Sequence, residues 1–129
     1  TTHLPFYSPK ESRDNPHLRQ QFQPLLEKYG VDLVLTGHDH TYGRGKGSDS
    51  PSGKSSIVYV VSVSGPKVYE AGNKEWMTVK GSNIQLFQEI SIDERTLTFK
   101  AFTPDGELFD HFRLKKRGNG TSRLIDSRK

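Results

Sequence analysis

The sequence has 129 residues, which suits a single domain, and its hydrophobic fraction of 31% supplies little material for a large core. It contains no cysteine, so disulfides and thiolate metal sites are excluded. Much of the excess positive charge behind the net +4 lies near the C-terminus without an aromatic-rich stripe, so we expect no nucleic-acid partner. No apolar run approaches the ~20 residues that a membrane helix needs, so we expect no membrane partner.

The first third of the sequence predicts a strand end, a helix and a buried strand. Pro5 and Pro9 exclude a helix from the first nine residues, where we expect a strand to end in a loop. Apolar residues at helical spacing predict a helix over 15–29, which Pro24 would kink or split. Residues 31–36 then read as a short strand with both faces buried.

The rest of the sequence reads as loop and antiparallel strands. A loop rich in Gly, Ser, Lys and Pro is expected to about residue 56, and residues 67–82 resist assignment. Strands are predicted over 57–64, 84–92, 96–102 and 108–114. Residues 117–129 lack apolar periodicity, so we expect a frayed tail after a domain that covers 1–116. The order of elements predicts a mixed α/β (α+β) class that ends in an antiparallel meander.

One short motif carries candidate chemistry. Gly37, His38, Asp39 and His40 directly follow the predicted buried strand, and sites in open α/β sheets form beyond the carboxyl ends of strands. If the strand that ends at His3 is a neighbour, three imidazoles meet at one sheet edge, where they suit Zn, Fe or Mn. A His-x-His pair in a loop is more often solvated than ligating, so spacing alone leaves both interpretations open. Asp39 could accept from an imidazole N–H or lie exposed, and we expect it to be exposed.

Two segments resemble consecutive motifs of the calcineurin-like metallophosphoesterases. Residues 31–44, VDLVLTGHDHTYGR, resemble the last metal-binding motif of the purple-acid-phosphatase-like branch, in which an aromatic residue and an arginine follow the Gly-His-x-His. Tyr42 and Arg44 match those positions, whereas Gly43 replaces an acidic residue often found between them. Residues 3–7, HLPFY, resemble the preceding motif, a metal-binding His followed by Pro and an aromatic residue. The interval between the two segments also fits the family.

The resemblance implies a role for each matching residue. His3 and His38 would bind one metal ion and His40 a second, with Fe, Zn or Mn in the longer protein and partial occupancy at most in this chain. The implied activity is two-metal hydrolysis of a phosphoric ester. Arg44 and Tyr42 become candidates for substrate contact, although a surface arginine and a packing tyrosine remain open alternatives. Lys67 follows Gly-Pro near the expected site and is also open between substrate contact and solvent.

Three further motifs of the family, Asp-x-His, Gly-Asp and Gly-Asn-His, have no counterpart after a strand in this sequence. We therefore assign no catalytic residue here and expect the catalytic histidine upstream. The chain would be the C-terminal portion of a sandwich of two mixed sheets flanked by helices, inactive alone, with exposed sheet edges that allow self-association. The resemblance favours a secreted or periplasmic location. Two alternatives remain: a non-catalytic metal-binding or interaction module, and a sugar- or protein-binding β domain with an incidental His motif.

Overall fold

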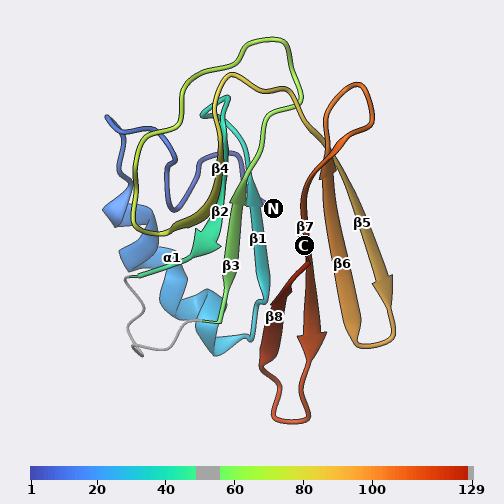
Figure 1. The fold of residues 1–129 in the computed structure, drawn as a ribbon. Helices are drawn as coiled ribbons and strands as arrows, with labels where there is room; N and C mark the ends of the chain where they lie inside the picture. The colour runs from blue at the N-terminus through green and yellow to red at the C-terminus, as the bar shows by residue number, and fades with distance from the viewer. Residues whose placement is uncertain (49–55, 128–129) are drawn as a thin grey trace.

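The computed structural model describes residues 1–48 and 56–127, which form one helix and two four-stranded sheets (Figure 1). The elements are α1 (Pro16–Lys28), β1 (Leu33–Thr36), β2 (Tyr42–Lys46), β3 (Val58–Val61), β4 (Met77–Gly81), β5 (Phe87–Asp93), β6 (Thr96–Phe102), β7 (Leu108–Lys116) and β8 (Ser122–Asp126). The first sheet has the order β1-β3-β2-β4 and is mixed, because only β1 and β3 run parallel. The second, β5-β6-β7-β8, is antiparallel throughout. The predicted α+β class with a final antiparallel meander is confirmed.

Helix α1 forms as one unbroken element in spite of its internal proline. Pro16 occupies the start of the helix, where the missing backbone N–H is of no consequence. Pro24 lies inside the helix on its exposed side, and the helix continues to Lys28. The inner side of α1 packs Leu18 and Leu26 against the first sheet.

The first sheet is buried on both faces, as the sequence predicted for residues 31–36. Along β3, Val58 and Val60 face the second sheet, whereas Tyr59 and Val61 face α1 and the N-terminal segment. Figure 1 shows the resulting layers, with α1 (blue) on one side of the first sheet and β5–β8 (orange to red) on the other. Two apolar clusters therefore sandwich the first sheet and fix its position.

Strand β2 lies where the sequence predicted a loop. Its alternate residues are glycines, which read as loop signals, but they form the flat side of a buried strand. A Cβ atom at Gly45 would collide with the backbone of Trp76, so only glycine allows this close approach. The other side of β2 carries Tyr42 and Arg44 toward the second sheet. Strand β4 likewise falls inside the segment 67–82 that resisted assignment.

The prediction of a frayed tail over 117–129 is wrong for most of that segment. Strand β8 pairs antiparallel with β7 from Phe112↔Asp126 to Lys116↔Ser122 and extends the second sheet to four strands. Leu124 packs against the core. The sequence did not indicate this strand, because Leu124 and Ile125 are a single apolar pair within a basic segment. A domain boundary at residue 116 would divide this hairpin. Residues 128 and 129 lie outside the described residues.

A buried ion pair joins the two sheets. Arg44 Nε donates to Asp110 Oδ2 at 2.7 Å and Nη2 donates to Oδ1 at 3.0 Å, with both side chains fully buried. Tyr42 Oη donates to the same carboxylate at 2.7 Å, and Arg44 Nη2 also donates to Asp126 at 3.1 Å. Burial acts to lower the pKa of Arg44, but the hydrogen bonds and attraction from Asp110 outweigh it and raise the pKa above its usual value. The guanidinium therefore stays charged and holds β2 to β7.

Removal of one member of this pair should destabilise the fold strongly. We expect Asp110→Ala to lower the free energy of unfolding by about 3–5 kcal/mol, because it leaves the buried charge of Arg44 poorly compensated. Urea unfolding measures this as a lower midpoint with little change in slope.

Glu89→Ala is the matched control, because it removes an exposed carboxylate of the same sheet that lies 4.0 Å from Lys100. Its expected effect is about 0–1 kcal/mol. Equal losses for the two variants would contradict the role given to the buried pair.

Candidate functional site

Two of the three candidate histidines meet at the edge of the first sheet. His3 Nε2 lies 2.9 Å from His38 Nδ1, and the two rings are edge-to-face with centroids 4.8 Å apart. Backbone hydrogen bonds bring the N-terminal segment beside β1: Thr2 N–H donates to Leu35 O, and Gly37 N–H donates to His3 O. The segment thus runs in the same direction as β1, and His3 reaches the loop where that strand ends.

His40 is oriented by the backbone of a distant segment. Its Nδ1 lies 2.9 Å from the carbonyl oxygen of Lys67, which can only accept, so Nδ1 carries the proton and donates it. In the neutral ring this leaves Nε2 with a free electron pair. The amide of Tyr69 donates to the carbonyl of His40 at 2.8 Å, so the segment 67–69 fixes both the ring and the backbone of His40.

The environment of His38 favours the neutral imidazole. The pKa of His38 is held below its ordinary value, first by desolvation and then by the positive charges of Arg13 and His3, with His40 adding to the effect. A neutral ring is the form that binds metal ions.

The loop that carries the histidines has an uncommon backbone. His38 and His40 both have positive φ, at 69° and 54°, a left-handed conformation that is disfavoured for residues with a side chain. The residue between them is buried, which corrects our expectation that Asp39 is exposed. Ser8 Oγ donates to Asp39 Oδ2 at 2.5 Å, and Arg13 Nε lies 3.2 Å from Oδ1 as an ion pair without hydrogen-bond alignment. These contacts tie the loop to the segment that follows His3.

The sequence analysis did not single out Ser8 or Arg13. Neither residue belongs to a periodic pattern or a recognised motif, and each reaches Asp39 only through the tertiary fold. Their position a few residues after His3 was visible in the sequence, but that spacing alone indicates no partner.

The donor atoms fit part of a metal site. Two imidazole nitrogens on one tetrahedral Zn ion lie about 3.4 Å apart, so the 2.9 Å between His3 and His38 requires only a small adjustment. The carbonyl that accepts from His40 is the kind of partner that orients metal-binding histidines. Within residues 1–48 and 56–127, however, no group of three or more His, Asp or Glu side chains is arranged to hold an ion. These residues therefore supply some ligands of a metal site and not a complete set.

The structure does not place Arg44 and Tyr42 at this site as substrate contacts. Both side chains are fully buried between the sheets, where they bond Asp110. Their predicted substrate roles are corrected, because β2 turns these side chains away from the histidine loop and into the core. Instead, Tyr42 and Arg44 anchor β2, the strand that follows the histidine loop, to the second sheet.

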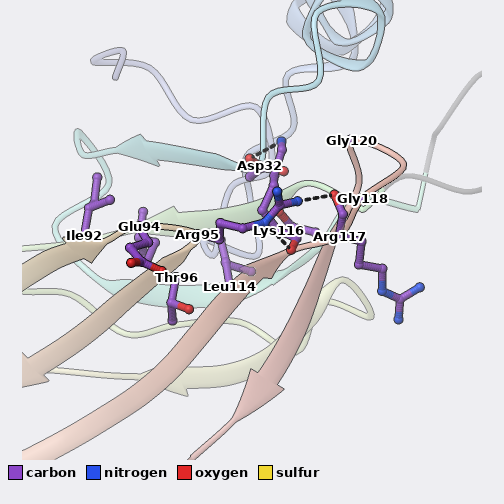
Figure 2. A pocket seen from close by; sticks show the side chains of 12 residues that line it. Asp32, Ile92, Glu94, Arg95, Thr96, Leu114, Lys116, Arg117, Gly118 and Gly120 are labelled. Carbon is purple, nitrogen blue, oxygen red and sulfur yellow. Dashed lines mark hydrogen bonds and ion pairs between the residues drawn. The ribbon is translucent and has the colours of Figure 1, made fainter.

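Of two pockets in the described residues, one lies away from the histidine loop and the other includes His3 in its lining. One, of about 440 Å³, lies between Asp32, the turn at Glu94 and Arg95, and the β7–β8 hairpin (Figure 2). Two of its basic side chains are engaged, because Lys116 Nζ bonds Asp32 at 2.8 Å and Arg95 donates to the Arg117 carbonyl at 2.8 Å. The other, of about 560 Å³, lies between α1 and β1, is mainly apolar and includes His3 in its lining.

Comparison with known proteins indicates a phosphatase relationship. The chain is 34% identical over 97 residues to an acid phosphatase of Aspergillus ficuum, a match that covers 72% of the chain and 15% of the relative. The chain thus spans only a small part of that protein. No family model matches the sequence.

A solved structure supports the fold. The chain is similar to the Plasmodium protein GAP50, described as the anchor in the inner membrane complex, with a TM-score of 0.50 and 18% identity. The similarity covers 98% of this chain and 35% of that one, and at this identity it shows the fold alone. Among the residues that the structure describes, none forms a helix long and apolar enough to cross a membrane.

Removal of the Asp39 carboxylate should separate the two histidine segments. We expect Asp39→Ala to lower the free energy of unfolding by about 1–3 kcal/mol, since the buried Ser8 hydroxyl loses its partner. We also expect the variant to lose the NMR cross-peaks between the rings of His3 and His38.

Asp39→Asn is the matched variant, because the amide oxygen still accepts from Ser8 while the charge opposite Arg13 is lost. It should keep most of the ring contacts. Persistence of the cross-peaks in Asp39→Ala would show that the carboxylate does not hold the loop.

Proposed function

We propose that this chain supplies the histidine ligands of a metal-dependent phosphoric ester hydrolase. His3 and His38 would bind one ion and His40 would bind a second through Nε2. The observation that carries the proposal is the contact of His3 with His38 at 2.9 Å from separate segments, next to a carbonyl-oriented His40. The match to an acid phosphatase supports the reaction class.

The strained backbone supports a functional role for the loop. A left-handed conformation at a non-glycine residue costs roughly 1–2 kcal/mol, and the loop carries this cost at both His38 and His40. Glycine would relieve it, so fold stability does not explain histidine at these positions. Such strain clusters at sites where the side chain performs a task. Asp39, which lies between the two histidines in the sequence, is buried, and its contacts with Ser8 and Arg13 would offset this cost.

The residues of the chain would bind and orient the ions. His38 is kept neutral by desolvation and nearby cations, so its electron pair is available. The Lys67 carbonyl fixes the tautomer of His40, and Asp39 holds the loop against the segment of His3. When bound, the two ions, as Fe, Zn or Mn, would polarise the phosphoryl group and offset its negative charge.

Three imidazoles do not balance two cations, so we propose that carboxylate ligands and the catalytic histidine come from polypeptide outside these 129 residues. The small share of the acid phosphatase that the chain spans supports this. We accordingly propose that the chain alone has no phosphatase activity. A secreted or periplasmic location stays a prediction from the family resemblance, and self-association through sheet edges stays a prediction of the fold.

Zinc binding by the chain tests the histidine set. We expect one Zn²⁺ ion to shift the ring signals of His3 and His38 in NMR titrations, and His38→Ala to weaken its affinity about tenfold or more. His17→Ala is the control, because His17 is exposed at the start of α1. Equal effects of the two substitutions, or none, would contradict the proposed ligands.

Hydrolysis of an aryl phosphate with added Zn, Mn or Fe tests the activity. We expect no turnover above background from the 129 residues, and turnover that depends on His38 from the full-length gene product. Enzyme-like turnover by the chain alone, abolished by His38→Ala, would overturn the incomplete-site proposal. A full-length product that binds metal through His38 without hydrolysing any ester would favour the non-catalytic metal-binding alternative.

A further inference from the structure

A pair of lysines lies next to the histidine loop and is explained by none of the roles above. Lys10 Nζ lies 4.4 Å from the centre of the Tyr69 ring, and Lys67 Nζ lies 5.5 Å from the same ring. The two residues come from segments far apart in sequence. The ammonium groups of both lysines therefore lie within 5.5 Å of the centre of one tyrosine ring.

This cluster is attached to the candidate metal ligand. The Tyr69 and His40 rings are edge-to-face with centroids 5.8 Å apart. The Tyr69 amide donates to the His40 carbonyl, and the Lys67 carbonyl accepts from the His40 ring. Lys10 is held through its backbone N–H, which donates at 3.1 Å to Ser8, the residue that bonds Asp39.

The two ammonium groups lack a carboxylate partner. In the described parts of the chain, no Asp or Glu lies within ion-pair distance of Lys10 or Lys67, whereas Lys116 pairs with Asp32. The acidic side chains of the neighbouring segments are engaged or turned to solvent. Asp39 bonds Ser8 and Arg13, Glu11 accepts from the Asn73 amide, and Glu70 is exposed.

Each lysine carries its ammonium group on a flexible stem, so an anion beside the ring can contact both groups and gain charge-assisted hydrogen bonds. We propose that Lys10, Lys67 and Tyr69 form an anion subsite for a second phosphate group of the substrate. The substrate class is an ester or anhydride that carries at least two phosphates, one at the histidines and one at the lysines. As a substrate subsite, this inference rests on the proposed function.

The geometry also specifies how the subsite acts. Tyr69 is 37% exposed, so an anion has access to the cluster from solvent. Because His40 and the cluster share the segment 67–69, the second phosphate would lie beside the metal ligands and not in the apolar pocket near His3. The lysines would then select for substrate charge and would take no part in bond cleavage.

Binding of inorganic pyrophosphate to the metal-free chain tests the subsite without involving the metal. Titrations at low salt, followed by backbone amide NMR, should shift the amides of Lys10, Lys67 and Tyr69. We expect pyrophosphate to bind about tenfold more tightly than inorganic phosphate, and Lys10→Ala and Lys67→Ala each to weaken pyrophosphate binding about three- to tenfold.

Lys28→Ala is the matched control, because Lys28 Nζ also lies over a tyrosine ring, that of Tyr29 at 5.5 Å, away from the histidines. This variant loses the same net charge and should bind pyrophosphate like the unmodified chain. A loss in Lys28→Ala equal to that in the other two variants would mean general attraction by a basic chain and would overturn the subsite.

The zinc titration separates the failure of this inference from that of the proposed function. Zinc binding at the histidines without lysine-dependent pyrophosphate binding would overturn the subsite and leave the proposed function standing. Lysine-dependent pyrophosphate binding without zinc binding at the histidines would overturn the proposed function and the assignment of the anion as substrate.

Discussion

The structure depends on the buried contact between Arg44 and Asp110, because this contact fixes the first sheet to the second. Strand β2 begins directly after the histidine loop, so the same pair that joins the sheets also anchors one end of that loop. The glycines on the opposite side of β2 let the strand lie against Pro9 and Trp76. The loop therefore leads into a strand that is held on both faces, which suits a site that needs fixed geometry.

A second polar contact, centred on Asp39, holds the other side of the loop. The carboxylate reaches Ser8 and Arg13, which follow His3 in the chain, so both segments that bring histidines share one buried charge. The backbone is left-handed on each side of Asp39, whose carboxylate accepts from Ser8 through Oδ2 and forms an ion pair with Arg13 through Oδ1. The fold thus carries a backbone conformation that lowers its stability in order to place the rings of His38 and His40, as functional loops commonly do.

The surroundings of the histidines are strongly cationic. Arg13 is balanced by Asp39, but the ammonium groups at Tyr69 have no carboxylate partner among the described residues. Such a field attracts anions, as the proposed function requires. The candidate metal ligands and the proposed anion subsite therefore share one electrostatic environment, built from the segments near Lys10 and Lys67.

The sequence by itself determined the α+β class, helix α1 and the buried strand before the histidine motif, because hydrophobic periodicity is a local signal. It also singled out the histidines as candidate ligands, because a short motif can be read without the fold. It did not reveal β2, whose glycines resemble a loop, or β8, whose apolar residues are few. Tertiary structure alone decided that Arg44 faces Asp110 instead of substrate, that Asp39 is buried, and that Lys10 meets Tyr69. The physical reason is that strand register and long-range pairing, not local sequence, decide which face of a strand or loop is buried.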